Sequence, residues 1–168
     1  MKEKDIWPKS RVEFLNSSKK KSLISTHLIK DEKQYQLNFD DESKGIQRYF
    51  GLAGLLTLMV KNPKIVFIDE IESSIHPDLV WHFLLTFLVN TKNSQLVVTT
   101  HLRDLLAEED LIRKDSIWFT ELKEDRYTDL FSLVNYPKKD LKNIYKAYKI
   151  GKFGAKPKLK DYFLDLED

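Results

Sequence analysis

Two adjacent carboxylates, Asp69 and Glu70, follow directly on the short apolar run Ile65 to Ile68. Such a run, rich in β-branched residues and preceded by Pro63, is typical of a strand buried in a parallel sheet. Open α/β sheets bind ligands at the carboxyl ends of their strands, where these two side chains would lie. In nucleotide hydrolases such a strand end carries a magnesium-holding aspartate, and the next carboxylate can act on the attacking water. A strand that ends in two solvated acids is the alternative, because short motifs give false positives.

Two further segments favour the functional interpretation. Residues 95–101 form a second apolar run that ends in a polar cluster with His101. Upstream, residues 41–48 form a polar turn that opens into an apolar helix and contains Ser43 and Gly45. A serine, a flexible glycine and the backbone amides of a helix N-terminus suit an anion such as phosphate.

This order of motifs resembles the C-terminal half of an ABC-type ATPase domain, and looks closest to the ABC-like ATPases of the prokaryotic AAA/OLD-like group. The motifs that carry the resemblance are a signature motif at Glu42 to Arg48, Walker B at Ile65 to Glu70, a D-loop at Ser73 to Pro77, a switch-histidine loop at Thr99 to His101, and a tail segment at Tyr148 to Ala155. Together they cover roughly residues 35–158. The implied fold class is α/β: part of a P-loop NTPase domain, with a parallel sheet, flanking helices and an antiparallel edge hairpin.

The resemblance implies ATP and Mg2+ as cofactors. Asp69 would hold Mg2+, as Walker B aspartates do. Glu70 would polarise the attacking water as a general base or a positioner. His101 would contact the γ-phosphate as a hydrogen-bond donor; a surface position or a cap is the alternative for this histidine.

Three residues of the signature-like segment would act in trans. By resemblance, Ser43 and Gly45 would touch a γ-phosphate bound on the P-loop of a second ATPase subunit, in a homodimer or with a P-loop-bearing half. The alternative for Ser43 is an ordinary helix N-cap. Arg48 lies one helical turn beyond Gly45 and could face the same phosphate; a surface cation is the alternative.

The other histidines receive simpler interpretations. His76 lies in the D-loop-like segment, which in this family contacts the partner subunit. A metal role for His76 is not indicated, because no second ligand lies at a helical or strand spacing from it. His27 and His82 are expected to be structural.

The chain lacks a phosphate-cradling P-loop, which needs the pattern G-x-x-x-x-G-K-[ST]. Only Gly151 is followed by lysine, and Phe153 comes next. A P-loop would therefore have to come from preceding sequence or from another chain. By itself the chain is expected to be inactive as an ATPase.

Composition limits the alternatives. With 168 residues, 42% hydrophobic and 12% aromatic, the chain is one domain or less with enough apolar side chains for a core. A net charge of +2 does not demand a nucleic-acid partner, and the absence of cysteine rules out disulfides and thiolate metal sites. No signal peptide is visible, and the run Leu52 to Val60 is shorter than the roughly 20 residues that span a bilayer. A cytoplasmic protein without membrane contact is expected.

The chain divides into three expected parts: an N-terminal segment over 1–21, expected to be poorly ordered; the ATPase-like part over 22–158; and an acidic tail over 159–168. The expected elements are a β-hairpin over 22–29 and 34–39, a largely buried helix over 46–60, strands at 65–68 and 95–100, a helix starting at Pro77, a short helix over 104–111, a hairpin of strands 116–121 and 127–134, and a basic helix over 138–149. In the helix from Pro77, one apolar face is expected from Leu79, Val80, Phe83, Leu84, Phe87 and Leu88.

The region Lys138 to Lys160 is rich in lysine, with Tyr145, Tyr148 and Phe153 interleaved. Such a pattern could bind a nucleic-acid backbone while bases stack on the rings. A solvated helix with inward-packed aromatics is favoured instead, because the overall charge is nearly balanced.

Two hypotheses for the function follow. The first is ATP binding and hydrolysis by the signature, Walker B and switch-histidine half of an ABC-like ATPase, in phage defence or DNA transactions by resemblance. The second is a non-hydrolysing module, a truncated or split ATPase fragment, that binds a partner ATPase through exposed apolar surface. Binding of nucleic acid through the lysines is the weakest reading.

Overall fold

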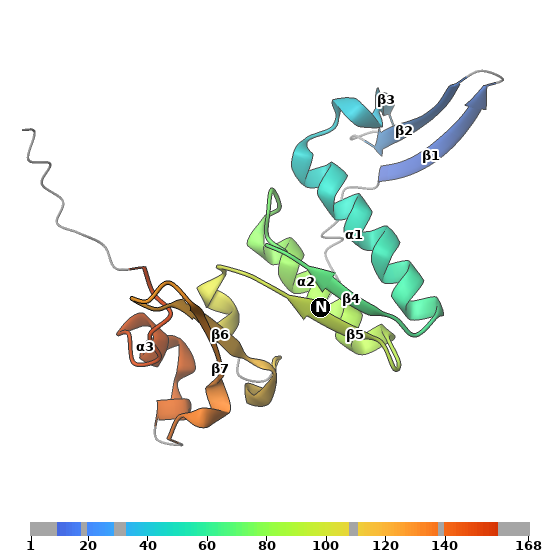
Figure 1. Cartoon of the computed structure of the whole chain (residues 1–168). Helices are drawn as coiled ribbons and strands as arrows, with labels where there is room; N and C mark the ends of the chain where they lie inside the picture. Colours follow the sequence, from blue (N-terminus) through green and yellow to red (C-terminus); the bar gives the residue numbers. More distant parts are fainter. Residues whose placement is uncertain (1–9, 18–19, 29–32, 108–110, 138–139, 158–168) are drawn as a thin grey trace, which may run out of the picture. The chain divides into compact units, whose positions relative to one another are not determined.

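A computed structural model describes residues 10–17, 20–28, 33–107, 111–137 and 140–157. The chain divides into two compact units, Met1–His101 and Leu102–Asp168, which are described separately below. Figure 1 shows the elements of both units. The predicted acidic tail over 159–168 lies outside the described residues.

An antiparallel three-stranded sheet opens the first unit, in the order β1 (Ser10–Ser17), β2 (Lys20–Leu28) and β3 (Gln34–Asn38). The pairing of β2 with β3 confirms the hairpin predicted over 22–29 and 34–39. A short 3-10 helix, η2 (Phe39–Asp41), follows β3. The sheet therefore leads the chain directly into the segment that resembles a signature motif.

Strand β1 was not predicted. It lies within residues 1–21, for which the sequence suggested an irregular segment, yet it pairs with β2 along its whole length. Its apolar residues Val12 and Phe14 do alternate with Arg11 and Glu13. The flanking lysines and the short run obscured this period-2 pattern.

Helix α1 (Lys44–Lys61) confirms the helix predicted over 46–60 and begins two residues earlier. The expectation that it is largely buried is wrong. Leu52 and Met59 are its buried residues, whereas Leu58 and Val60 are about half exposed. Leu55 and Leu56 are partly buried, so α1 is covered on one part of its surface only.

Strands β4 (Ile65–Ile68) and β5 (Gln95–Val98) pair in parallel, and helix α2 (Pro77–Asn90) connects them. Both strands were predicted, although β5 ends two residues earlier than expected. Figure 1 shows α2 along one face of this small sheet. The mixture of helices with a parallel strand pair agrees with an α/β fold.

The apolar face of α2 was predicted in large part. Val80, Phe83, Leu84 and Phe87 are buried, but Leu88 is 52% exposed. These side chains form the core of the first unit together with Leu52, Met59, Ile68, Ile71 and Ile75. This core supports the ends of β4 and β5, from which the candidate site is built.

The second unit contains a two-stranded antiparallel sheet, β6 (Trp118–Leu122) and β7 (Thr128–Ser132), which confirms the second predicted hairpin. These strands form a sheet of their own and pair with no other described strand. The expectation that they extend the parallel sheet as an antiparallel edge stays a prediction. Sequence patterns identify a hairpin but do not show which sheet it joins.

The helices of the second unit are shorter than predicted. The helix expected over 104–111 is a 3-10 turn, η3 (Arg103–Leu106), within the described residues. The basic helix expected over 138–149 is reduced to η6 (Asp140–Lys142) and α3 (Ile144–Lys149). Asn143 interrupts it, because its side chain caps α3 by accepting a hydrogen bond from the backbone N–H of Lys146 (2.7 Å). Two further 3-10 turns are η4 (Lys114–Ser116) and η5 (Leu133–Asn135).

An aromatic cluster holds the second unit together. Phe153 is 1% exposed and stacks on Phe119 at 5.5 Å between ring centroids, and Tyr148 stacks on the same ring at 5.5 Å. The hydroxyl of Tyr136 donates to the carbonyl of Phe153 (3.0 Å). Two of the three rings interleaved with the lysines thus pack inward, as the favoured interpretation of that region predicted.

No helix among the described residues combines the length and apolar character needed to cross a bilayer.

Candidate functional site at the ends of β4 and β5

The hydroxyl of Thr99 connects the two strand ends. It donates to Oδ1 of Asp69 (2.5 Å) and accepts from the backbone N–H of Glu70 (2.8 Å). The parallel register, in which Ile68 pairs with Val98, places these residues at the same edge of the sheet. Thr99 therefore orients the carboxylate of Asp69 directly and also holds the backbone of Glu70.

Glu70 begins the loop after β4 in a left-handed conformation with φ of 45°. Such a φ is uncommon for a residue with a side chain, so the backbone bond to Thr99 helps to hold it. The imidazole Nε2 of His101 lies 3.9 Å from Oε1 of Glu70. Both side chains are well exposed, at 59% for Glu70 and 88% for His101, and can reach a ligand in solvent.

Glu72 ties the loop after β4 to the loop after β5. Its Oε1 accepts a hydrogen bond from the backbone N–H of His101 (2.6 Å). Burial works to raise the pKa of Glu72, but the hydrogen bonds from His101 and from the hydroxyl of Thr100 outweigh it and hold that pKa below its usual value of 4.5. Glu72 is thus an anionic brace under the histidine loop.

Arg48 crosses from helix α1 to the end of β4. Its Nη2 donates to the backbone carbonyl of Asp69 (3.5 Å), and its Nε is buried without a hydrogen-bond partner among the described residues. Arg48 is thus half-buried against the end of β4. Its role toward a phosphate stays a prediction.

The start of α1 approaches the loop that precedes α2. Ser43 is the N-cap of α1, and its Oγ accepts from the backbone N–H of Ile46 (3.3 Å). A Cβ on Gly45 would come within 2.9 Å of the backbone carbonyl oxygen of Ser74, which itself has a φ of 63°. Glycine is thus required here for a close backbone approach. The capping role of Ser43, the plainer alternative, is present in the structure.

His76 and Pro77 start α2. Pro77 is the first helical residue, as predicted, and His76 caps the helix by accepting from the backbone N–H of Asp78 through Nδ1 (3.2 Å). His82 meets the hydroxyl of Tyr49 on α1 at 2.8 Å, and His27 contacts Glu42. The structural roles expected for His27 and His82 agree with these contacts.

The predicted site residues fall into two connected groups. Asp69, Glu70 and His101 lie at the strand ends, and Arg48 joins them through the carbonyl of Asp69. Ser43 and Gly45 lie at the start of α1 and meet this group through the loop that contains Ser74. The role of Ser43 and Gly45 toward the nucleotide of a second subunit stays a prediction.

The sequence did not single out two residues of the site, Thr99 and Glu72. Thr99 was noticed only as the first residue of the segment that resembles a switch-histidine loop, with no role of its own. Glu72 lies two residues beyond Glu70 in the presumed loop, so an additional acid in that loop was the one signal available. Their importance comes from contacts across thirty residues of chain, which no local pattern contains.

This arrangement can perform chemistry on a phosphate. An exposed strand-end carboxylate such as Asp69 is the hard oxygen ligand that Mg2+ prefers, and Mg2+ sites use one or two protein carboxylates with substrate phosphates. The described residues contain no group of three or more side chains that could hold a metal ion. Magnesium binding by Asp69 stays a prediction.

The first unit thus combines helices with a parallel strand pair and carries two adjacent carboxylates directly after β4. A family model described as "AAA domain, putative AbiEii toxin, Type IV TA system" matches residues 2–108, more than half of the chain. The chain belongs to this family of AAA domains. Family membership indicates an ATPase-like, nucleotide-binding function, which in such domains generally uses Mg2+. Among curated proteins, no match was found.

Proposed function

We propose that this chain is the signature, Walker B and switch-histidine half of an ABC-like ATPase of the OLD-like group. It would bind and hydrolyse ATP when a P-loop is supplied by preceding sequence or by another chain. The observation that carries the proposal is the contact of the Thr99 hydroxyl with both Asp69 and Glu70, with His101 beside Glu70. This contact gathers the residues of two separate motifs at one sheet edge.

The roles follow from the geometry. Asp69 would hold Mg2+, and the ion, when bound, would neutralise charge on the phosphate oxygens. Glu70 is exposed and backbone-anchored, so its carboxylate could accept a proton from the attacking water. His101 stands close enough to Glu70 to share that water, and Glu72 keeps the histidine loop in place.

The residues at the start of α1 would act on a second nucleotide. Ser43 and Gly45 lie at a helix N-terminus, where backbone amides and the helix dipole favour an anion. Arg48 is half-buried and donates to the carbonyl of Asp69 at the end of β4 (3.5 Å). A head-to-tail arrangement of two subunits would bring these residues to a γ-phosphate held on the other subunit.

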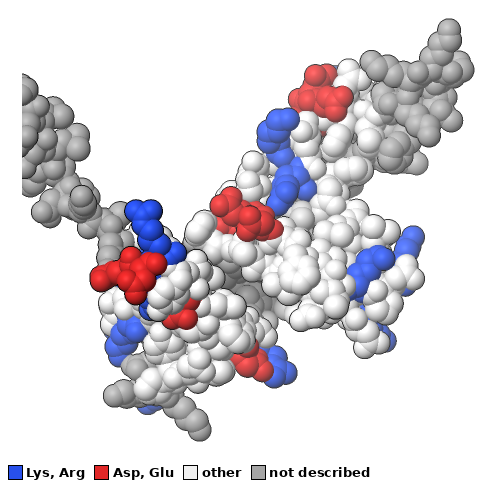
Figure 2. Space-filling model, in the orientation of Figure 1, with Lys and Arg blue, Asp and Glu red and all other residues white. Residues whose placement is uncertain are grey.

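The exposed face of the β4–β5 sheet supports the proposal that a further segment packs against it. Parallel sheets are normally covered on both faces. Here Ile65 is 66% exposed, Phe67 75% and Val97 40%. The visible surface over these strands is largely uncharged (Figure 2). A segment that carries the P-loop would cover this face and complete the sheet.

A second candidate, the non-hydrolysing module that binds a partner ATPase, rests on the same exposed face. Unlike the ATPase half, this module would not need Glu70 to accept a proton from water. The biological setting we favour is prokaryotic defence, since the family description names a toxin of a type IV toxin–antitoxin system. Nucleic-acid binding through Lys138 to Lys160 has less support, because Phe153 and Tyr148 pack against Phe119 and are not available to stack on bases.

The test compares the chain with the assembly that contains a P-loop segment, identified as an adjacent reading frame and purified together with this chain. Release of phosphate from ATP is measured with and without Mg2+. The proposal expects turnover by the assembly with Mg2+ and none by the chain alone. An assembly that binds ATP but never hydrolyses it would favour the non-hydrolysing module.

A further inference from the structure

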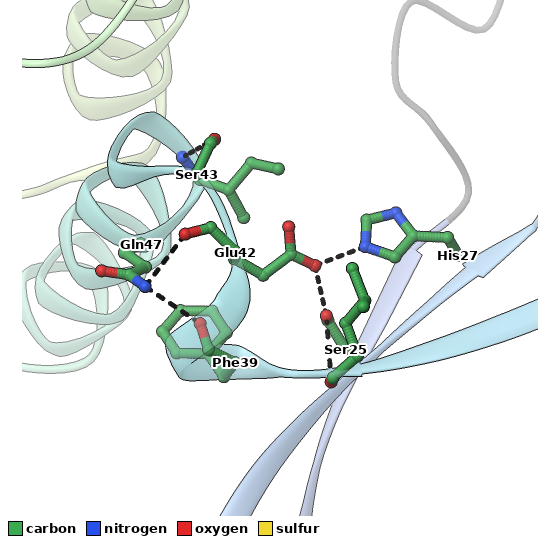
Figure 3. A network of polar contacts seen from close by, with 8 residues as sticks. Ser25, His27, Phe39, Glu42, Ser43 and Gln47 are labelled. Carbon is green, nitrogen blue, oxygen red and sulfur yellow. Dashed lines mark hydrogen bonds and ion pairs between the residues drawn. The ribbon is translucent and has the colours of Figure 1, made fainter.

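A buried carboxylate, Glu42, lies at the turn between the three-stranded sheet and α1. It is 8% exposed, and its neighbour Ser25 on β2 is 2% exposed. Within the described residues these are two of the three buried polar side chains, the other being Ser132 in the second unit. Burying a charge is costly unless it is paired and hydrogen-bonded. Figure 3 shows how Glu42 is paired.

Two side chains of β2 converge on one oxygen of Glu42. The hydroxyl of Ser25 and Nε2 of His27 both contact Oε1 of Glu42. Ser25 and His27 are two residues apart on one strand, so they project from the same face of the sheet. Burial works to raise the pKa of Glu42, but these hydrogen bonds and the charge of His27 outweigh it, so that pKa lies below its usual value.

Strand β3 fixes the direction of the histidine. His27 pairs with Tyr35 across the sheet, and their rings stack at 4.7 Å between centroids with an angle of 11° between planes. The side chain of His27 is 15% exposed. The sheet therefore presents the imidazole to Glu42 in a set orientation.

Helix α1 holds the same turn from the other side. The side-chain amide of Gln47 lies within hydrogen-bond distance of the carbonyls of Phe39 (3.1 Å), Asp40 (3.0 Å) and Glu42 (3.1 Å). The ring centroids of Phe39 and Phe50 are 4.9 Å apart. Residues 39–42 thus contact the sheet through Glu42 and the helix through Gln47 and Phe50.

The turn leads directly to the residues that would meet a phosphate. Ser43 follows Glu42 as the N-cap of α1, and Gly45 packs against the carbonyl of Ser74. A shift of the sheet would move Glu42, and with it the start of α1. Contacts thus run from His27 to Glu42, and the backbone continues from Glu42 through the N-cap Ser43 to Gly45.

We infer that Glu42 is a positioning residue that couples the three-stranded sheet to the helix start at Ser43 and Gly45, with His27 and Ser25 as its anchors on the sheet. An apolar side chain could fill the same space without desolvating a charge, so the directional network serves to specify geometry. The consequence for catalysis rests on the proposed function. The coupling itself is a property of this chain alone.

The test uses three variants of the full chain. His27→Phe keeps a ring that can stack on Tyr35 but removes the donor to Glu42. His27→Gln removes the ring and restores an N–H donor. Thr26→Val is the matched control, since Thr26 lies between Ser25 and His27, projects from the opposite face of the sheet, and meets Gln36 at 3.5 Å. Circular dichroism confirms that each variant is folded.

Backbone hydrogen exchange at Ile46 and Gln47 reports the helix start, because these N–H groups bond to Oγ and the carbonyl of Ser43, respectively. His27→Phe is expected to speed exchange there by about tenfold, with residues 55–59 in the middle of α1 unchanged. His27→Gln should recover most of the protection, and Thr26→Val should leave it intact. Exchange at Ile46 and Gln47 that stays within about twofold of the wild type in folded His27→Phe would overturn the inference, as would equal acceleration throughout α1.

A second measurement uses the ATPase assembly. Because the P-loop would supply most of the nucleotide affinity, His27→Phe should lower kcat by about tenfold while KM for ATP stays the same, and His27→Gln should restore kcat. An unchanged kcat in an active assembly would overturn the catalytic consequence of the inference. If the wild-type assembly shows no hydrolysis, the proposed function fails while the exchange result still decides the coupling.

Discussion

The backbone N–H of His101 donates a hydrogen bond to Oε1 of Glu72 at 2.6 Å. This bond joins the loop after β4 to the loop after β5, so hydrogen bonds connect the two strand ends. Thr99 supplies the second link through Asp69 and Glu70. Glu72 therefore positions the loop of His101, the histidine that would contact the nucleotide. The carboxylate of Glu72 does not itself lie at the exposed edge.

Replacing Glu72 should loosen the histidine loop without removing a group that touches the nucleotide. In Glu72→Ala, kcat of the ATPase assembly is expected to fall by about tenfold to a hundredfold, because a misplaced positioning group has effects of that size. Steady-state phosphate release measures it. Asp125→Asn, in the hairpin turn of the second unit, is the control and should change nothing. Full activity of Glu72→Ala would show that His101 needs no brace.

Gly45 and Gly51 offer a matched pair on one helix. A Cβ at Gly45 would meet the carbonyl of Ser74 at 2.9 Å, whereas a Cβ at Gly51 would meet nothing within 4 Å. Alanine has the higher helix propensity, so Gly51→Ala should stabilise the chain by about 0.5–1 kcal/mol. Gly45→Ala should lose that gain and destabilise the chain, because the Ser74 carbonyl must move. Urea unfolding measures both, and equal effects of the two substitutions would contradict the close approach.

Glu42 should make stability depend on pH. Its pKa is lowered in the folded chain from an ordinary value of 4.5. A group with a lowered folded pKa contributes stability above its unfolded pKa and loses that contribution as the pH falls through the folded pKa. The free energy of unfolding of the wild type, relative to Glu42→Gln, should therefore decrease below about pH 4.5. Denaturant unfolding at several pH values between 7 and 3.5 measures it, and a difference independent of pH would contradict the lowered pKa.

The exposed sheet face should be needed for assembly but not for folding. Phe67 is 75% exposed on β4, and Val89 is 79% exposed on α2. Phe67→Ser should leave the stability of the chain within about 0.5 kcal/mol and weaken binding of the P-loop segment by at least about tenfold. Val89→Ser is the control on another surface and should leave binding intact. Titration calorimetry measures the affinity, and equal losses in the two variants would place the interface elsewhere.

Apart from β1, the strands and helices of the first unit could be predicted, because their signals are short-range. The run Ile65 to Ile68, the proline at the start of α2 and the alternation in β2 and β3 each specify an element by themselves. The burial of α1 could not be predicted, since apolar residues on most of its faces do not reveal that part of the sheet and helix surface stays uncovered. The hairpin β6–β7 was recognised for the same local reason.

The candidate site shows the same division. Asp69, Glu70 and His101 could be named because each follows an apolar run in a recognisable order. Thr99, Glu72 and Glu42 could not, since their partners lie between fifteen and thirty residues away along the chain. Roles that depend on such contacts need the three-dimensional structure.

The most direct test of the account is Glu70→Gln in the assembly that contains a P-loop. Glutamine keeps the shape of the side chain but cannot accept a proton from water, so ATP turnover should fall by about a hundredfold or more while ATP-driven dimerisation persists. Phosphate release and sedimentation velocity with ATP measure the two properties on the same sample. Turnover that survives the substitution would contradict the assignment of Glu70 as the catalytic carboxylate, and with it the Walker B interpretation of this strand end.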